Sequence, residues 1–200
     1  MNLKSLLTMT AAVTTAAFFS SCANVPSGGG RGLGAYHAYD RPTKLPSNPS
    51  NVRVKVSLSK QRTYVMEGSE VLLAMPVSVG APGTTTPAGS FTIFNKVEKK
   101  RANTHGYAYS GNNIKKTMLS SRPAGWSFKG TPMPYWCEFK PNYGFHTGWV
   151  KHQPCTHGCI RMHENLAPKF FKIVKIGTPV NIAYSQPEDS TLSIPLPPDA

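Results

Sequence analysis

The sequence predicts a mostly β fold with one short helix. Apolar and polar residues alternate from 52 to 58, the two-residue period of a half-buried strand. Seventeen Gly and 18 Pro in 200 residues predict many turns and argue against an all-helical bundle. Leu166, Phe170 and Val174 recur four apart, which indicates the single amphipathic helix. This length suits one ordinary domain with tails.

Turn signals order the remaining elements. Glu67-Gly68 and Pro141-Asn142 each separate two apolar runs and predict β-hairpins. Asn165 is the expected N-cap of the helix, and Gly177 its stop signal. Residues 99–130 show no period. The strands expected after 52–58 are 63–66, 71–79, 90–97, 136–139, 143–145 and 180–184.

The N-terminus has the layout of a bacterial export signal. Lys4 precedes a moderately apolar run over 6–19, and Ser20-Ser21-Cys22 follows. The run is too short for a transmembrane helix, which needs about 20 apolar residues. A Cys after small residues resembles a lipoprotein signal, so we expect Cys22 to be acylated and to anchor the chain to a membrane. An ordinary signal peptide cut near Cys22, which would release a soluble protein, is the alternative.

These features divide the chain into four parts. We expect a lipoprotein-type signal peptide at 1–21, a flexible linker at 22–51, a folded domain at 52–184 and a Pro-rich tail with little to bury at 185–200. The protein would then be exported and membrane-anchored, facing the periplasm or cell wall.

The net charge of +13 predicts attraction to a polyanion. Nucleic acid, anionic lipid and an acidic wall polymer all fit the charge. Nucleic acid is the least favoured of these partners, because the chain is expected to be exported and has no nucleic-acid-binding motif. Much of the charge lies in the aperiodic stretch and just before it, where Glu98 is opposed by Lys96, Lys99, Lys100, Arg101, Lys115, Lys116, Arg122 and Lys129.

Cysteine and histidine crowd into one segment. Six of the chain's ten such residues are His146, His152, Cys155, His157, Cys159 and His163. Zinc ligation is one interpretation, yet the spacing fits no common structural zinc site, so we expect no metal. We expect His152 and His163 to be surface histidines.

Residues 154–162, Pro-Cys-Thr-His-Gly-Cys-Ile-Arg-Met, resemble the Ser/Thr-His-Gly-Cys signature of the L,D-transpeptidases, the YkuD-domain enzymes that cross-link bacterial peptidoglycan. Other segments resemble the family in the same order, and together they span most of 52–184. They are 79–83, 86–93, 133–135, 145–148 and 177–180. The resemblance implies a YkuD-type curved mixed β-sandwich that needs no cofactor.

The resemblance also assigns an acyl-transfer site. Cys159 would be the nucleophile, and His146 the general base, because a thiol of pKa about 8.5 is mostly protonated at neutral pH. The family implies that the Thr147 backbone carbonyl orients the His146 ring. His157 and Gly158, with Cys159, would donate backbone N–H groups to an oxyanion.

Further roles are less specific. Arg161 would hold a substrate carboxylate or brace its loop. Tyr135 and Trp149 would contact substrate, although core packing explains an aromatic residue equally well. Trp126 and Trp136 share this ambiguity. With Cys22 lipidated and Cys159 free, Cys137 and Cys155 would form a disulfide; a Cys155–Cys159 bridge and two buried thiols are the alternatives.

The resemblance implies a peptidoglycan L,D-transpeptidase, acting as a monomer on stem peptides. Cys159 would form a thioester that an amine resolves, giving a 3→3 cross-link or an attached protein. Hydrolysis of the same bonds by a carboxypeptidase or endopeptidase is the alternative within enzymes. A non-catalytic wall-binding module is the alternative outside them.

Overall fold

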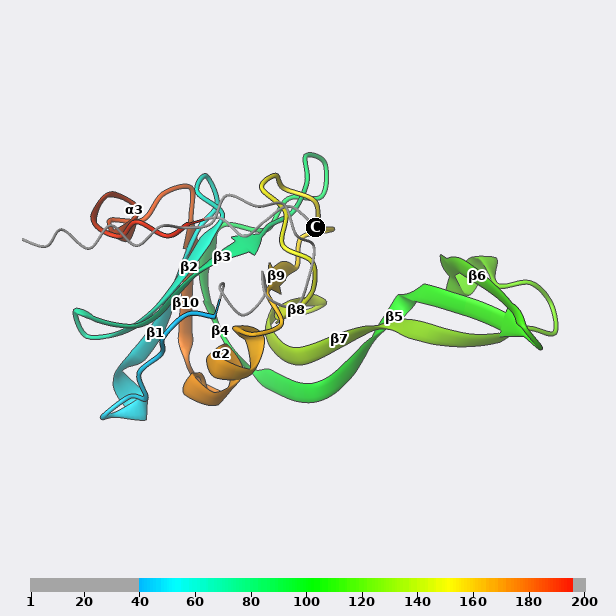
Figure 1. Ribbon diagram of the computed structural model, residues 1–200, viewed down its shortest axis with the longest axis horizontal. Helices are drawn as coiled ribbons and strands as arrows, with labels where there is room; N and C mark the ends of the chain where they lie inside the picture. The colour runs from blue at the N-terminus through cyan, green and yellow to red at the C-terminus, as the bar shows by residue number, and fades with distance from the viewer. Residues whose placement is uncertain (1–39, 196–200) are drawn as a thin grey trace, which may run out of the picture.

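The computed structural model describes residues 40–195, which form one mixed ten-stranded sheet in the order β4-β10-β1-β2-β3-β9-β8-β7-β5-β6 (Figure 1). The mostly β prediction is confirmed, with one continuous sheet. The strands are β1 (Val52–Ser57), β2 (Arg62–Glu67), β3 (Glu70–Ser78), β4 (Gly89–Thr92), β5 (Asn95–Ser110), β6 (Asn113–Met118), β7 (Ser127–Lys140), β8 (Tyr143–Thr147), β9 (Ile160–Met162) and β10 (Pro179–Ala183). The helices are α2 (Ala167–Ile173) and α3 (Glu188–Thr191), with 3-10 turns η1 (Pro49–Asn51) and η2 (Leu119–Ser121).

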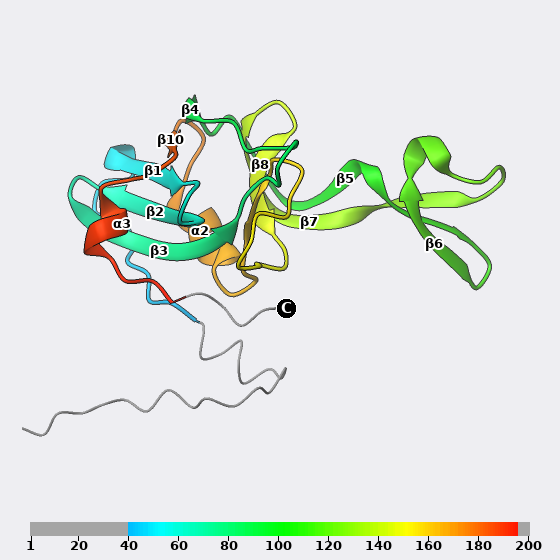
Figure 2. The ribbon, with the colours of Figure 1, turned by 90° about the horizontal axis from the view of Figure 1, so that it is seen from above.

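The core lies where α2 packs against the sheet (Figure 2). Phe170 of α2 is fully buried, and its ring centroid lies 4.7 Å from that of Phe145 in β8. Phe139 of β7 contacts the Phe145 ring edge-on, with centroids 5.5 Å apart. The predicted helix is present, but Leu166 takes the N-cap position expected for Asn165. No helix among residues 40–195 is long and apolar enough to span a membrane.

Residues 99–130, expected to be irregular, instead form much of a three-stranded ribbon of β5, β6 and β7. The ribbon projects from the body in both views (Figures 1 and 2). Because most of its side chains are exposed and two of its buried positions, Gly106 and Gly130, are glycines, its strands carry little of the apolar alternation that reveals a half-buried strand. Close backbone crossing requires glycine here: a Cβ on Gly130 would lie 2.0 Å from the Ala102 carbonyl oxygen.

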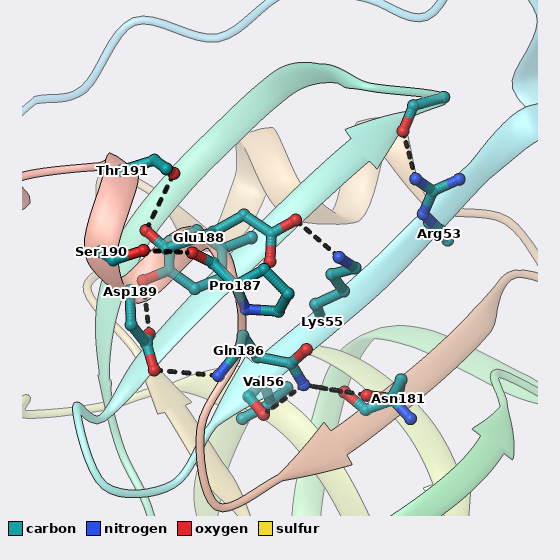
Figure 3. Close-up of polar contacts among 12 residues, drawn as sticks. Arg53, Lys55, Val56, Asn181, Gln186, Pro187, Glu188, Asp189, Ser190 and Thr191 are labelled. Atoms are coloured by element: carbon teal, nitrogen blue, oxygen red, sulfur yellow. Dashed lines mark hydrogen bonds and ion pairs between the residues drawn. The ribbon is translucent and has the colours of Figure 1, made fainter.

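The tail after 184 was expected to bury little, but it packs on the sheet through α3 (Figure 3). The Gln186 side-chain amide is buried and donates to the Val56 carbonyl at 3.1 Å. Asp189 accepts hydrogen bonds from Ser57 Oγ at 2.7 Å and Tyr64 Oη at 2.8 Å. The folded unit therefore extends beyond the predicted boundary at 184.

The end of the predicted linker also lies on the domain. The Lys44 backbone N–H donates to the Leu72 carbonyl at 2.9 Å, and Asp40 pairs with Lys169 of α2. The predicted signal peptide and Cys22 lie outside the described residues.

Candidate active site

Two adjacent parallel strands, β8 and β9, bring the predicted nucleophile and base together. Phe145 pairs with Ile160 and His146 with Arg161. Phe145 and Ile160 are fully buried in the core. Because side chains alternate between faces along a strand, His146, Arg161 and the preceding Cys159 belong to the opposite face. The core pattern thus sets the direction of all three polar side chains.

The segment before Cys159 is tied down by threonines of the loop after β3. Thr86 Oγ1 accepts from the Gly80 N–H and donates to the Gly158 carbonyl, each at 2.9 Å. Thr84 Oγ1 donates to the Thr156 carbonyl at 2.9 Å. Sequence reasoning placed Thr86 in a family-like segment without giving it a role, and these bonds explain why that segment accompanies the Cys motif.

Within the segment, Thr156 organises the turn that precedes Cys159. Its Oγ1 donates to the Cys159 carbonyl at 2.6 Å and accepts from the Gly158 N–H at 3.1 Å. The Gly158 N–H, which was expected to face an oxyanion, thus donates to Thr156 Oγ1 in this structure. Gly158 has φ +104°, and a Cβ there would lie 2.5 Å from Tyr143 Cε1, so both conformation and space require glycine.

Cys159 is a partly buried thiol in a mixed electrostatic environment. Its Sγ lies 3.7 Å from the Asn142 carbonyl oxygen. Burial raises the pKa of the thiol, and this outweighs the lowering by the Gly144 N–H and the positive charge of Arg161. The resting group is thus a protonated thiol at neutral pH, and it needs a base to become a nucleophile.

His146 is the predicted base. Its Nδ1 lies 2.7 Å from the Thr147 carbonyl oxygen, so the expected contact is present. A carbonyl only accepts, so Nδ1 carries the proton and Nε2 keeps its lone pair. Burial lowers the pKa of His146 to about 4; the Thr147 bond opposes this shift and Arg161 adds to it. The imidazole is therefore neutral at neutral pH.

Glu138 of β7 supports the hairpin beside these residues and was missed from sequence. Its carboxylate accepts from Trp136 Nε1 at 3.2 Å and from the Asn142 N–H at 3.0 Å. Burial would raise the pKa of Glu138, but these bonds and one from Asn95 lower it overall. The charge thus fixes the turn whose Asn142 carbonyl contacts Cys159. An acidic residue three positions before Pro141 was the available signal.

Arg161 lies across the same face. Its side chain covers Gly148, where a Cβ would lie 2.9 Å from Arg161 Cδ. Its Nη1 lies 3.7 Å from Cys155 Sγ. The predicted Cys137–Cys155 disulfide is not formed: both are free thiols. Cys137 points into the core and is fully buried, while Cys155 contacts Arg161 on the other face.

The remaining aromatic and histidine residues named from the sequence lie in different surroundings. Tyr135, which was expected to contact substrate, packs edge-on against Phe171 beside α2, with ring centroids 5.7 Å apart. Trp136 instead faces the site, 6.1 Å from the His146 ring. Trp149 is 62% exposed beyond β8. His163, expected at the surface, is buried.

His157 is exposed and meets a residue that sequence reasoning did not select. Its ring stacks on that of His105 in β5, with centroids 5.4 Å apart and planes 17° apart. The projecting ribbon thus contacts the segment that carries Cys159. Nothing in the sequence signals this contact across 52 positions. Among residues 40–195, no three His, Cys, Asp or Glu side chains gather closely enough to hold a metal ion.

A mixed β sheet that presents a cysteine and a neutral, backbone-oriented histidine on one face defines a candidate thiol acyl-transfer domain. The family model of the L,D-transpeptidase catalytic domain (YkuD) matches residues 51–182, and the chain belongs to that family. A comparison with curated proteins finds no match.

Solved L,D-transpeptidases share the fold. The enzyme from Stackebrandtia nassauensis has a TM-score of 0.52 and 20% identity, over 72% of this chain and 60% of its own. The enzyme from Mycobacterium smegmatis has a TM-score of 0.52 and 21% identity, over 66% and 58%. An L,D-transpeptidase in complex with imipenem has a TM-score of 0.51 and 21% identity, over 66% and 59%. The chain thus spans about 60% of the length of these structures.

Proposed function

We propose that this protein is a peptidoglycan L,D-transpeptidase with Cys159 as nucleophile and His146 as general base. The observation that carries the proposal is the pairing of β8 with β9, which puts both side chains on one face. The hydrogen bond of His146 Nδ1 to the Thr147 carbonyl leaves Nε2 as the basic atom.

The first half-reaction forms a thioester. His146 Nε2 takes the proton from Cys159 Sγ, and the thiolate attacks the carbonyl carbon of the third residue, a diamino acid, of a tetrapeptide stem. When the tetrahedral intermediate collapses, the bond to the terminal D-Ala breaks. His146 returns the proton to the leaving amine. Free D-Ala departs, and the stem stays on sulfur.

The second half-reaction transfers the acyl group. The amine of another stem attacks the thioester, His146 accepts its proton, and the thiolate leaves and is reprotonated. The product is a 3→3 cross-link; a protein amine as acceptor gives a wall-attached protein. Water in place of the amine gives a carboxypeptidase or endopeptidase reaction.

The surrounding groups support the negative charge that develops. The Gly144 N–H and the Arg161 guanidinium both favour the thiolate over the thiol. Because the Gly158 N–H is bonded to Thr156, we assign the oxyanion donors to the backbone N–H groups of His157 and Cys159. Arg161 and exposed Trp149 remain our proposed substrate contacts.

Product analysis tests the proposal. A defined disaccharide-tetrapeptide is incubated with the full chain, and products are read by mass spectrometry. The proposal predicts dimers cross-linked between two third residues and release of D-Ala, both lost in Cys159→Ala. Trimmed tripeptide alone favours the hydrolase. Binding without any product favours the wall-binding module.

We also propose that the chain is exported and tethered to a membrane through acylated Cys22. The support is the sequence pattern around Ser20-Ser21-Cys22. Cys22→Ser should move the protein from the membrane fraction to the soluble fraction; unchanged fractionation refutes the lipid anchor.

A further inference from the structure

The β5–β6–β7 ribbon has one open face that begins at the candidate active site. In an antiparallel pair, residues directly opposite point to the same face. Tyr107 pairs with Lys116 and Lys129, and Tyr109 pairs with Ile114. The ribbon face is therefore defined by Tyr107, Tyr109, Ile114, Lys116, Met118 and Lys129.

The ribbon face is exposed although it is rich in large apolar side chains. Tyr107 is 39% exposed, Tyr109 41% and Ile114 73%. The other face is partly closed, because Ala108 is fully buried and the Phe128 ring covers Gly106. Exposed aromatic rings beside cations are typical of binding surfaces.

The charge of the ribbon restricts the partner. Between residues 99 and 137 the chain has seven Lys and Arg and no Asp or Glu. Two of these cations, Lys116 and Lys129, flank Tyr107 on the ribbon face itself. Such a face favours a partner that offers both apolar surface and negative charge.

The ribbon face leads to Cys159. His105 is two residues before Tyr107 and pairs with Met118, so it shares this face. Its ring stacks on His157, which is two residues before Cys159. At about 3.3 Å per residue, the face extends roughly 13 Å from His105 to Tyr109. The ribbon face therefore begins beside the segment that carries Cys159.

We propose that the ribbon face binds the glycan strand of peptidoglycan and delivers an attached stem peptide to Cys159. Sugar rings present C–H faces that pack on the flat tyrosine rings, and their hydroxyls reach the tyrosine Oη atoms. Stem carboxylates pair with Lys116 and Lys129. This assignment rests on the proposed function, since it names how that substrate is held.

The test measures binding separately from chemistry. The full chain carrying Cys159→Ala is co-sedimented with insoluble peptidoglycan sacculi. Adding Tyr107→Ala and Tyr109→Ala should weaken binding on the order of tenfold, about 1.4 kcal/mol. Tyr184→Ala is the matched control, because Tyr184 is 77% exposed at the end of β10 and lies outside the ribbon; it should bind like the parent.

Several outcomes overturn the proposal. Unchanged binding by the Tyr107→Ala/Tyr109→Ala chain does so, and so does loss only with Lys116→Ala/Lys129→Ala, which indicates charge attraction alone. If the tyrosine variant loses binding to phosphatidylglycerol vesicles but not to sacculi, the partner of the ribbon face is a lipid surface. If the parent chain is a dimer in gel filtration and the variant is not, the partner is a second copy of the chain. Melting curves of each variant identify unfolding, and a second double variant, Tyr107→Phe/Tyr109→Phe, keeps ring stacking and should retain most binding.

The proposed function can fail independently. If the chain with intact Cys159 forms no product from a soluble tetrapeptide, transpeptidation is wrong while the sacculus measurement still reads the ribbon face. If product forms but ribbon variants bind sacculi like the parent, only the docking proposal is wrong.

Discussion

Gly158→Ala perturbs the turn before Cys159, and the structure allows the cost to be worked out. Gly158 has φ +104°, and a residue with a Cβ pays roughly 1–2 kcal/mol to stay in a left-handed conformation. The new Cβ would also lie 2.5 Å from Tyr143 Cε1, in a ring that packs against the core. Such crowding costs typically about 1–3 kcal/mol. The expected loss of unfolding free energy is therefore about 2–5 kcal/mol.

Gly177→Ala separates the two costs. Gly177 has φ +94°, and no atom lies within 4 Å of a Cβ built there. Its substitution should cost only the conformational part, roughly 1–2 kcal/mol. Urea unfolding of both variants gives the two values. The rate at which iodoacetamide alkylates Cys159 should change only in Gly158→Ala, because the displaced Tyr143 lies between Asn142 and Gly144, the two residues whose backbone contacts the sulfur. Equal stability losses and equal alkylation rates in the two variants would refute this reasoning.

Four further results are expected. Because the pKa of His146 is lowered on folding, the unfolded state binds a proton there at a higher pH than the folded state does. The free energy of unfolding should therefore fall by up to about 3 kcal/mol as the pH drops from about 6.5 to 4. Urea unfolding of His146→Ala should lack this loss, and the same pH dependence in wild type and variant would contradict the reasoning. Thr86→Val unpairs two buried backbone groups and should cost about 1–3 kcal/mol by urea unfolding and slow the alkylation of Cys159, whereas wild-type values for both refute the bracing role. Asp189→Ala removes the acceptor of Tyr64 Oη and should lower the melting temperature, where no change means the tail is not docked. Cys137 is buried and its pKa is raised to about 12, so it should react with a thiol reagent only once the chain is unfolded. The unfolding is done without reductant, so that a Cys137 that stays unreactive in the unfolded chain would indicate a disulfide.

Sequence patterns predicted the parts of the fold that bury apolar side chains. The alternation at 52–58 became β1, and the hairpin around Pro141-Asn142 became β7 and β8. The ribbon escaped prediction because exposed strands need no apolar period. The docked tail escaped because its contacts are polar bonds from Gln186 and Asp189 to distant strands.

The site was predictable where one motif holds the residues and unpredictable where the fold brings them together. Cys159 and His146 follow from local motifs, and the β8–β9 register then places them. The direction of Tyr135 depends on its φ of +58° and on α2, so a motif could not show that Trp136 faces the site instead. The His105–His157 contact depends on the path of the ribbon.

Intact mass spectrometry of the full chain with a tetrapeptide stem tests the central proposal most directly. Rapid acid quenching should trap a covalent adduct equal to the stem without its terminal D-Ala. Peptide mapping should place it on Cys159, and hydroxylamine should remove it as expected for a thioester. The adduct should be absent in Cys159→Ala and form on the order of 10² to 10⁴ times more slowly in His146→Ala. An adduct on another residue, or product formation by Cys159→Ala, would contradict the proposed mechanism.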